Sequence, residues 1–378
     1  MKQRLFTPGP TPVPESVMLR MAQPLIHHRN PEFQEIFARV NESLKYVFQT
    51  AQPVITLTSS GTGAMEAAIV NLFSPGDTVI YINGGKFGER WGKISRAYNL
   101  EAIEVKVPWG TAAQPEQIEE ALKQRPTAKA VLLTHSETST GVFTNIKRIN
   151  DIIKSSSNAL TIVDGITSVG AHEMRFDEWG LDCIITGSQK GLMMPPGLAF
   201  ITLSERAWAM SAESKLPKFY FNLAIAKKSL LTNDTAWTPA ITLVLGLDTA
   251  LDMLRAEGIE NVWARHERLT RAVRAGCEGL GLKLFGNSPS HALTSVWLPE
   301  AVDGKKFLDT LKKIYGVTTA AGQDDYKGKI FRISHLGYYD DADITGLFTC
   351  VELALGAVGY SFSQGAGVGA AQKELMRK

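Results

Sequence analysis

Between residues 54 and 203, short runs of apolar and β-branched residues alternate with longer stretches in which apolar residues recur at helical spacing. Alternation of this kind predicts an α/β fold, with a mostly parallel sheet covered by helices on both faces. Ligands of such sheets bind beyond the carboxyl ends of the strands, so we expect functional residues in the turns there. The expected strands are 54–57, 78–82, 102–107, 130–133, 160–163, 183–185 and 198–203, and the expected helices are 64–73, 87–97, 115–124 and 146–155.

The pattern differs on either side of this region. Prolines recur through residues 6–14, which cannot form a helix or a central strand, so residues 1–20 are expected to be an extended arm lying on another surface, such as a partner subunit. Residues 21–257 form the expected large domain, and residues 258–360 a smaller α+β domain. The glycine-rich and then basic tail, 361–378, is expected to be flexible. Further expected elements are helices 238–255, 259–279, 304–315 and 343–356 and strands 292–298, 316–319 and 329–334.

The composition excludes several classes of function. A formal net charge of +2, without acidic or basic blocks, disfavours nucleic-acid binding. No apolar run reaches membrane-spanning length and the first twenty residues are not a secretory signal, so we expect a cytoplasmic protein without a membrane partner. Cys183, Cys277 and Cys350 lie far apart without a CxxC pair, which argues against a zinc site and against disulfides.

One lysine lies where an apolar strand enters a small polar turn. Residues 183–185 are apolar, Lys190 follows in the turn, and a glycine and proline loop leads to the next strand. Desolvation lowers the pKa of a lysine and makes its amine a nucleophile or a base. We therefore hypothesise a Schiff-base lysine at Lys190, against the alternative that it marks the solvated end of a strand.

The turn after the first strand can bind a phosphate. Ser60, Gly61 and Thr62 open a helix there, and backbone N–H groups with neighbouring hydroxyls at a helix N-terminus form an anion site. Neither the lysine of a Walker motif nor the glycine spacing of a dinucleotide fold is present. An ordinary helix cap is the alternative.

Two further strand ends complete a constellation. Phe87 lies in a glycine-rich turn and is able either to stack on a flat ligand or to anchor the core. Asp164 follows a strand, where an unpaired charge is costly, so it needs a cationic or protonated partner or caps a helix. The turn at residues 60–62, here called the phosphate cup, is followed along the chain by an aromatic ring, an aspartate and a lysine. These are the groups that a protein requires to bind pyridoxal 5′-phosphate.

With these residues assembled, the chain resembles the class V pyridoxal-phosphate aminotransferases, and within them the alanine-glyoxylate and serine-glyoxylate group. The resemblance extends from residue 7 to about residue 357. Its most specific match is Gly187-Ser188-Gln189-Lys190, followed by Pro195-Pro196-Gly197. The resemblance implies a fold-type I transferase. Other matching stretches are 46–50, 61–67, 139–142 and 331–334.

The resemblance also implies roles for individual residues around the cofactor. Lys190 is implied to form the aldimine, Asp164 to pair with the pyridine nitrogen, and Phe87 to stack on the ring. Thr138 matches a hydroxyl position near the cofactor. The implied phosphate contacts are Ser60, Gly61, Thr62, which stands where animal relatives have histidine, and Gln189.

Other implied contacts concern the substrate and a second subunit. Arg332, on the opposite face of its expected strand from its two neighbours, is implied to hold the substrate carboxylate. Thr238 is implied to reach the phosphate of a neighbouring subunit, which implies a homodimer with shared active sites, whereas Thr235 stands where animal relatives have tyrosine. His28 and Arg29 belong either to the pocket border or to the interface.

The implied reaction is a ping-pong transamination between a small amino acid, alanine or serine, and a 2-oxo acid, with glyoxylate favoured. A cysteine desulfurase or related lyase is an alternative, but it needs a cysteine on a mobile loop, and Cys277 and Cys350 fall in expected helices. A non-catalytic binding protein of this fold is disfavoured by intact Lys190, Asp164 and Arg332. The sequence does not rank the donors, because one methyl or hydroxyl group is worth only about 1–3 kcal/mol.

Overall fold

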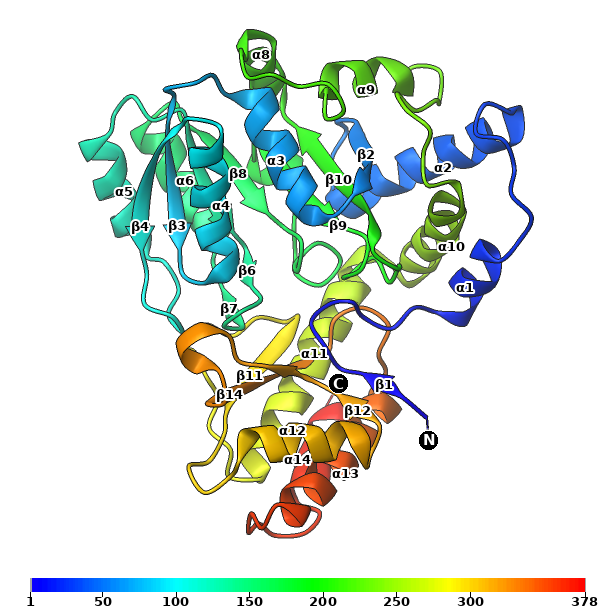
Figure 1. Cartoon of the computed structure of the whole chain (residues 1–378), viewed down its shortest axis with the longest axis vertical. Coiled ribbons are helices and arrows are strands. Elements are labelled where there is room, and N and C mark those ends of the chain that lie inside the picture. Colours follow the sequence, from blue (N-terminus) through cyan, green and yellow to red (C-terminus); the bar gives the residue numbers. More distant parts are fainter. Residues whose placement is uncertain (1, 378) are drawn as a thin grey trace.

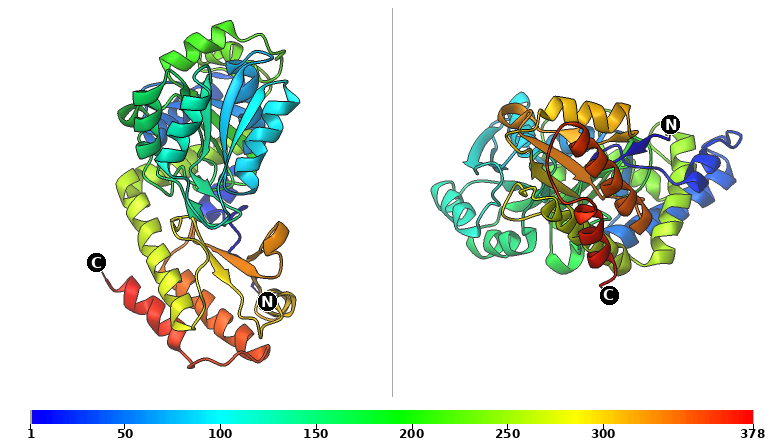
Figure 2. Two further views of the ribbon diagram at one scale, coloured as in Figure 1. Left: turned by 90° about the vertical axis from the view of Figure 1, so that its left-hand side faces the viewer. Right: turned by 90° about the horizontal axis from the view of Figure 1, so that it is seen from below.

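The computed structural model describes residues 2–377. Figure 1 shows a large part built around a twisted sheet, and below it a smaller part that holds both ends of the chain. In the side view of Figure 2, helix α11 (Ile259–Gly279) runs from the large part into the smaller one. Among residues 2–377, no helix has both the length and the apolar character needed to cross a bilayer.

The central sheet has seven strands in the order β2-β10-β9-β8-β5-β3-β4. All neighbours are parallel except β10, which runs antiparallel to both β9 and β2. The expected mostly parallel sheet is therefore confirmed. Residues 188–196 between β9 and β10 are too few for the crossover that a parallel pair requires, so β10 must turn back. The strands are β2 (Val54–Ser59), β3 (Thr78–Asn83), β4 (Glu101–Lys106), β5 (Ala130–Thr134), β8 (Leu160–Asp164), β9 (Cys183–Gly187) and β10 (Gly197–Leu203).

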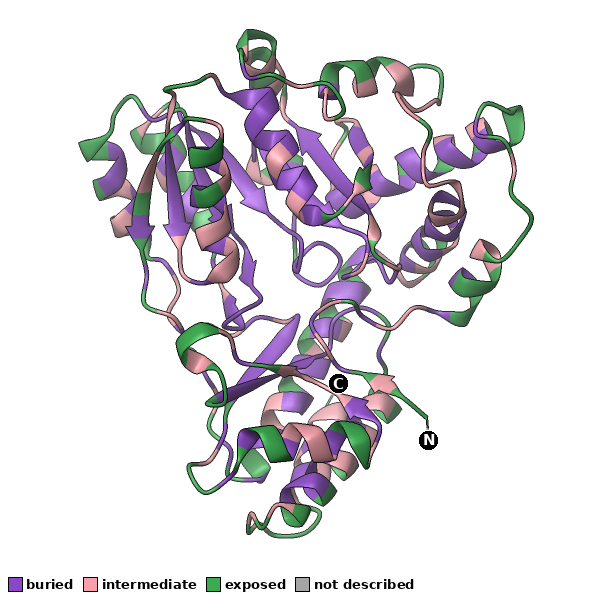
Figure 3. Cartoon of the chain, in the orientation of Figure 1, coloured by how far each residue is buried: buried purple, intermediate pink, exposed green. Residues whose placement is uncertain are grey.

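Helices cover both faces of this sheet. Side chains of one strand alternate between two apolar clusters: in β5, Val131 and Leu133 face one cluster, whereas Ala130 and Leu132 face the other. Burial on both faces explains the nearly continuous apolar runs of the inner strands. Figure 3 shows these inner strands as buried, whereas the edge strand β4 is mostly exposed or intermediate. One face carries α1 (Glu15–Met21), α2 (Pro31–Phe48), α5 (Pro115–Gln124), α6 (Ile146–Ser156) and α10 (Ile241–Glu257), and the other carries α3 (Gly61–Leu72), α4 (Lys86–Ala97), α8 (Glu205–Glu213) and α9 (Leu223–Leu230).

The smaller part contains an antiparallel sheet in the order β11-β14-β13. The expected strand 316–319 is present in shorter form as β12, and a second short strand that was not expected, β13, follows it in a different sheet. One of them, β12, pairs with β1 of the N-terminal arm. The elements are β1 (Arg4–Leu5), β11 (Leu293–Trp297), β12 (Val317–Thr318), β13 (Ala320–Ala321), β14 (Ile330–Ser334), α12 (Gly304–Lys313), α13 (Asp341–Ala357) and η1 (Asp324–Tyr326). Short elements of the large part are β6 (Ser136–Glu137), β7 (Val142–Phe143) and α7 (Phe176–Trp179).

The C-terminal segment differs from expectation. Residues 366–375, expected to be flexible, form helix α14 (Ala366–Leu375), which packs against α11 and α13. The carboxylate of Glu352 accepts hydrogen bonds from the backbone N–H groups of Gly365, Gly367 and Val368, at 2.8–3.0 Å. This carboxylate satisfies N–H groups that the first turn of a helix leaves free. A cap supplied from another helix therefore stabilises a segment whose own glycines disfavour a helix.

Two other boundaries also differ. Residues 15–20, expected to belong to an extended arm, form most of helix α1. Helix α10, expected from Thr238, begins at Ile241. Pro239 explains the second difference, because a proline disfavours helical backbone at the residue before it. Thr238 consequently lies in the segment that precedes the helix.

Candidate active site

Lys190 lies in the turn after β9 and is buried, with 8% of its surface exposed. The amine donates a hydrogen bond to the carbonyl oxygen of Pro8. The pKa of Lys190 is lowered to about 8, mainly by burial; the charge of Asp164 opposes this shift, and the charges of Arg332 and Arg90 add to it. The alternative of a solvated strand end is therefore wrong, and at pH 7 about a tenth of this amine is uncharged, far more than at an ordinary lysine.

Asp164 is the last residue of β8, the strand beside β9. Its Oδ1 accepts a hydrogen bond of 2.8 Å from the backbone N–H of Ile166, which forms a turn and not a helix cap. Burial raises the pKa of Asp164 to about 7, opposed by that hydrogen bond and by the charges of Arg90 and Lys190. Within residues 2–377, no hydrogen bond reaches Oδ2, so this oxygen is available to a protonated ligand nitrogen.

The antiparallel strand β10 brings two predicted turns together. Gly197, at its start, pairs with Ser59 at the end of β2, and Ala199 pairs with Gly187 at the end of β9. The phosphate turn follows β2 and the lysine turn follows β9. These two turns therefore emerge at the same end of three adjacent strands.

The phosphate turn presents free donors. Ser60 precedes α3 in extended conformation, and Gly61 and Thr62 are the first helical residues, whose N–H groups have no partner within the helix. A Cβ at Gly61 would lie 2.5 Å from Ile166 Cδ1, so glycine is required for this packing. The Oε1 atom of Gln189 is buried and, within residues 2–377, accepts no hydrogen bond. The free N–H groups at the start of α3 fit an anionic group, whereas this Oε1 atom is an acceptor.

Phe87 is the second residue of α4, at the start of the helix that follows β3. The carboxylate of Glu137 fixes its position by accepting hydrogen bonds from the backbone N–H groups of Phe87 and Gly88, at 3.1 and 2.9 Å. Burial raises the pKa of Glu137, and hydrogen bonds from Ser139, Gly88 and Phe87 oppose this shift. Sequence reasoning missed Glu137, although a carboxylate within a run of buried hydroxyl residues is a usable signal.

Arg332 on β14 points out of the small-domain core, to which its neighbours Phe331 and Ile333 belong. Its Nη1 donates to the backbone oxygen of Thr138 at 2.7 Å, and its Nε and Nη2 donate to the oxygen of Ala321 at 3.1 and 2.8 Å. Burial lowers the pKa of Arg332 to about 10. Since a guanidinium has five N–H groups, two remain for an anion.

Thr138 also uses its side chain. Its hydroxyl shares a hydrogen bond of 2.6 Å with the hydroxyl of Thr167, in the loop after β8. Both residues are buried. The Thr138 backbone oxygen orients Arg332, so one residue connects the loop beyond Asp164 with the residue implied to bind substrate.

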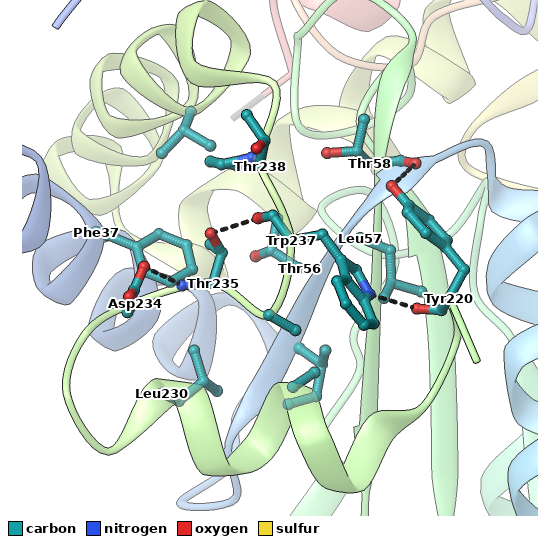
Figure 4. Close-up of a pocket in the computed structure, with 15 residues that line it drawn as sticks. Phe37, Thr56, Leu57, Thr58, Tyr220, Leu230, Asp234, Thr235, Trp237 and Thr238 are labelled. Atoms are coloured by element: carbon teal, nitrogen blue, oxygen red, sulfur yellow. Dashed lines mark hydrogen bonds between the residues drawn. The ribbon is translucent and has the colours of Figure 1, made fainter. Parts of the chain in front are cut away.

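Thr238 does not join this group within one chain. It lines a groove with Thr235, Thr58, Tyr220 and Trp237 (Figure 4). Within residues 2–377, no hydrogen bond or ion pair connects Thr238 with Lys190 or Asp164. The Thr235 hydroxyl donates to the backbone oxygen of Trp237 at 2.7 Å and therefore has a structural partner.

Of His28 and Arg29, only Arg29 is seen, within the described residues, to contact a residue that lines this groove. Arg29 Nη1 forms an ion pair of 2.9 Å with Asp234, a residue that lines the groove. The buried ring of His28 stacks on His27, with 4.7 Å between the ring centroids. These contacts tie the loop between α1 and α2 to the segment before α10.

The cysteines are not arranged as a reactive or metal-binding group. Burial raises the pKa of Cys183 in β9 and of Cys277 in α11, and Cys350 lies within α13 and not on a loop. In the part of the chain that the structure describes, no three His, Cys, Asp or Glu side chains are placed to hold a metal ion together.

Comparison with known proteins gives a consistent family. The family model for class-V aminotransferases matches residues 4–343. The chain is 44% identical to a Synechococcus protein named soluble hydrogenase, small subunit, over 99% of this chain and 98% of that one. It is 36% identical to the serine–glyoxylate aminotransferase of Hyphomicrobium methylovorum, over 97% and 93% of the two chains.

A solved structure agrees with the sequence relatives. Ureidoglycine-glyoxylate aminotransferase from Bacillus subtilis superposes with a TM-score of 0.94 at 28% identity, covering 99% of this chain and 98% of that one. The match extends over the central sheet and the smaller part alike. The chain therefore belongs to the class-V aminotransferase family and has the α/β fold of the fold-type I transferases.

Proposed function

We propose that this aminotransferase uses pyridoxal 5′-phosphate, held at Lys190, to transfer an amino group from alanine or serine to a 2-oxo acid in a ping-pong reaction. Glyoxylate is the favoured acceptor, since two relatives with different donors are both named for it. The observation that carries the proposal is the burial of Lys190 and Asp164 at the ends of neighbouring strands, beside the free N–H groups of α3.

The residues present fit this cofactor. The backbone N–H groups of Gly61 and Thr62 offer donors to a phosphate, and the free Oδ2 of Asp164 suits a protonated pyridine nitrogen. When bound, the cofactor supplies an electron sink for the substrate α-carbon. A cationic ring nitrogen would also lower the pKa of Asp164, because an opposite charge favours the ionised carboxylate.

Lys190 has the properties of the proton carrier. Burial brings the pKa of its amine to about 8, close to the range in which one group both accepts and donates a proton efficiently. In this proposal the neutral Nζ removes the proton from the substrate α-carbon and returns it on the cofactor side. The Pro8 carbonyl provides a nearby hydrogen-bond acceptor for the charged amine.

Arg332 would select the carboxylate shared by both substrates. Three of its N–H groups are fixed by Thr138 and Ala321, so its remaining two are held in one orientation. The same grip serves the amino acid in the first half of the reaction and the 2-oxo acid in the second. A bidentate contact of this kind gives orientation as well as affinity.

We also propose a homodimer in which Thr238 reaches the phosphate of the other subunit. Its groove lies away from Lys190 of the same chain, and large apolar side chains near it are exposed, among them Phe219 at 75% and Leu231 at 83%. Exposed apolar groups concentrated in one region are typical of an interaction surface. Leu231→Glu should shift the molar mass in solution from dimer towards monomer, whereas an unchanged mass would contradict this assignment.

The reaction is tested by the exchange of the substrate α-proton. Lys190→Ala, loaded with the cofactor, should lose exchange of the α-hydrogen of alanine or serine with deuterated water, because the proton carrier is gone. Near wild-type exchange would show that Lys190 is not that carrier. Donors and acceptors should then be screened in pairs on the wild type, with spectral change of the cofactor as the signal for each half-reaction.

A further inference from the structure

Arg90 connects the phosphate turn with the aromatic residue of the site. It lies one helical turn after Phe87 on α4, and its Cζ is 4.7 Å from the centroid of the Phe87 ring. Its Nη1 donates a hydrogen bond of 2.8 Å to Oγ1 of Thr62. Thr62 follows β2 and Phe87 follows β3, two strands that are not neighbours in the sheet. Arg90 therefore joins two turns that the sheet itself does not connect.

This contact settles which way the Thr62 hydroxyl donates. A guanidinium has only donors, so Oγ1 of Thr62 must be the acceptor in the pair. The hydroxyl hydrogen is consequently not used in this pair. Within residues 2–377 no hydrogen bond donated by this hydroxyl is present, which leaves it free for an anion at the start of α3.

Arg90 also places a positive charge beside otherwise neutral phosphate donors. The backbone N–H groups of Gly61 and Thr62, the hydroxyl and the Gln189 amide carry no net charge, and a helix N-terminus contributes only about half a unit. The charge of Arg90 acts on both Asp164 and Lys190, so it is felt across the site. A phosphate dianion in the cup would be partly balanced by it.

We propose that Arg90 is a positioning residue for the cofactor phosphate: it holds Thr62 as a hydrogen-bond donor and supplies the positive charge beside the cup. This inference rests on the proposed use of pyridoxal 5′-phosphate. It extends that proposal by assigning phosphate affinity to a residue outside the strand-end turns. The contact with the Phe87 ring keeps the guanidinium in place.

The same helix offers a matched control. Arg96 also donates to a hydroxyl, that of Tyr81 at 2.8 Å, and its Cζ lies 5.4 Å from the ring of the same tyrosine. Tyr81 belongs to the core and not to the strand-end turns. Arg96→Met therefore removes the same kind of contact from α4 without touching the phosphate cup.

The test compares binding of pyridoxal 5′-phosphate with binding of pyridoxal, which lacks the phosphate, to the apoenzyme. Arg90→Met should raise the dissociation constant of pyridoxal 5′-phosphate roughly 10-fold to 100-fold, as expected for a lost charge-assisted contact. Its dissociation constant for pyridoxal should stay within about 3-fold of wild type, since that ligand makes no phosphate contact. Arg96→Met should leave both constants at the wild-type values.

Two further variants test the contact between Arg90 and Thr62, and an unfolding measurement checks that each variant folds. Thr62→Val should weaken phosphate binding, and adding Arg90→Met to it should cost less than Arg90→Met alone, because the two residues act on one contact. Arg90→Lys keeps the charge and should recover part of the affinity. Urea unfolding of each apoenzyme variant identifies any that fails to fold.

The outcomes are distinct for the two proposals. Equal weakening of pyridoxal and pyridoxal 5′-phosphate by Arg90→Met, or no weakening of either, would overturn the role of Arg90. If the wild type itself bound no pyridoxal 5′-phosphate, the proposed function would fail instead.

Discussion

The carbonyl oxygen of Pro8 accepts a hydrogen bond from the amine of Lys190, although the two residues are 182 positions apart. Thr11 continues the contact by donating from its hydroxyl to the backbone oxygen of Lys190 at 3.2 Å. At its other end the arm pairs with β12 of the smaller part. The N-terminal arm is thus a wall of the candidate site as well as a link between the two parts.

Gly9→Ala should destabilise the apoenzyme through a clash with Lys190. A Cβ at Gly9 would overlap the amine and lie 2.5 Å from Cε of Lys190. We expect the free energy of unfolding in urea to fall by about 1–3 kcal/mol, as for other overpacked sites.

The control for this variant must separate the clash from backbone strain, since φ of Gly9 is +139°. Gly76 has φ +85°, and no atom lies within 4 Å of the position that a Cβ would take there, so Gly76→Ala reports strain without a clash. In the Lys190→Ala background, Gly9→Ala should cost at least about 0.5 kcal/mol less than in the wild type. An identical cost in both backgrounds would show that the lysine is not responsible.

Asp164→Asn should change the pH dependence of apoenzyme stability. The folded-state pKa of Asp164 is raised to about 7 by burial, above the value near 3.9 of an unfolded chain. Its stabilising contribution is therefore present at low pH and is lost as the pH rises towards 7, by up to about 1.4 kcal/mol per pH unit. The stability of Asp164→Asn relative to wild type should rise between pH 4 and 7, measured by urea unfolding; a difference independent of pH would contradict the raised pKa.

Buried histidines between the two parts should make the protein sensitive to acid. The rings of His172 and His291 stack with centroids 4.7 Å apart, and Nε2 of His172 accepts a hydrogen bond from the backbone N–H of His291 at 2.9 Å. Burial lowers the pKa of His135 and of His335 to about 3, with the charge of His291 lowering both. The rings of these four histidines are all buried or largely buried.

The sign of the effect follows from these shifts. The unfolded chain binds protons below about pH 6.5 while the folded protein does not, so stability is present above that pH and is lost as the pH falls towards 3. Each histidine contributes up to about 1.4 kcal/mol per pH unit in that window. His135→Asn should make the decline between pH 6.5 and 5 shallower than in wild type. A slope unaffected by His135→Asn would refute this account.

Glu352→Gln should weaken the attachment of α14. The carboxylate accepts three backbone N–H groups at the start of that helix, and an amide cannot accept through its nitrogen. We expect a loss of about 0.5–2 kcal/mol in unfolding free energy, as for other helix caps. In Glu352→Gln, hydrogen exchange should become faster than in wild type within residues 366–375, and this increase should be larger there than in α11. Glu267→Gln, which removes only a surface pair with Arg271, should leave the exchange of α14 unchanged.

The sequence was sufficient to predict the position of those site residues that lie at the ends of strands in the sheet. Lys190, Asp164 and the turn at Gly61 could be placed because each comes directly after an apolar run, and the ends of parallel strands share one edge of a sheet. Their burial, and hence their pKa shifts, follows from that placement.

Glu137 and Arg90 could not be placed in the same way. Their partners, the N–H groups of α4 and the hydroxyl of Thr62, come from segments distant in sequence. Helix α14 was missed for a related reason, since its cap is Glu352 of another helix. Such partners can be identified only once the packing of the helices is known, and local sequence propensity does not determine that packing.

Strand β10 finally has a consequence for the synthesis of the protein. Among the residues that the structure describes, β10 is the only strand that pairs with β2 in the central sheet. The strand that leads into the phosphate turn therefore stays unpaired until β10 has been made. A ribosome adds roughly 5–20 residues per second, so the wait is on the order of 10 s. During that interval the glycine and hydroxyl residues of the phosphate turn are present in the nascent chain, but they are not yet arranged as in the folded protein. The phosphate turn can therefore take its folded geometry only in the second half of translation or later.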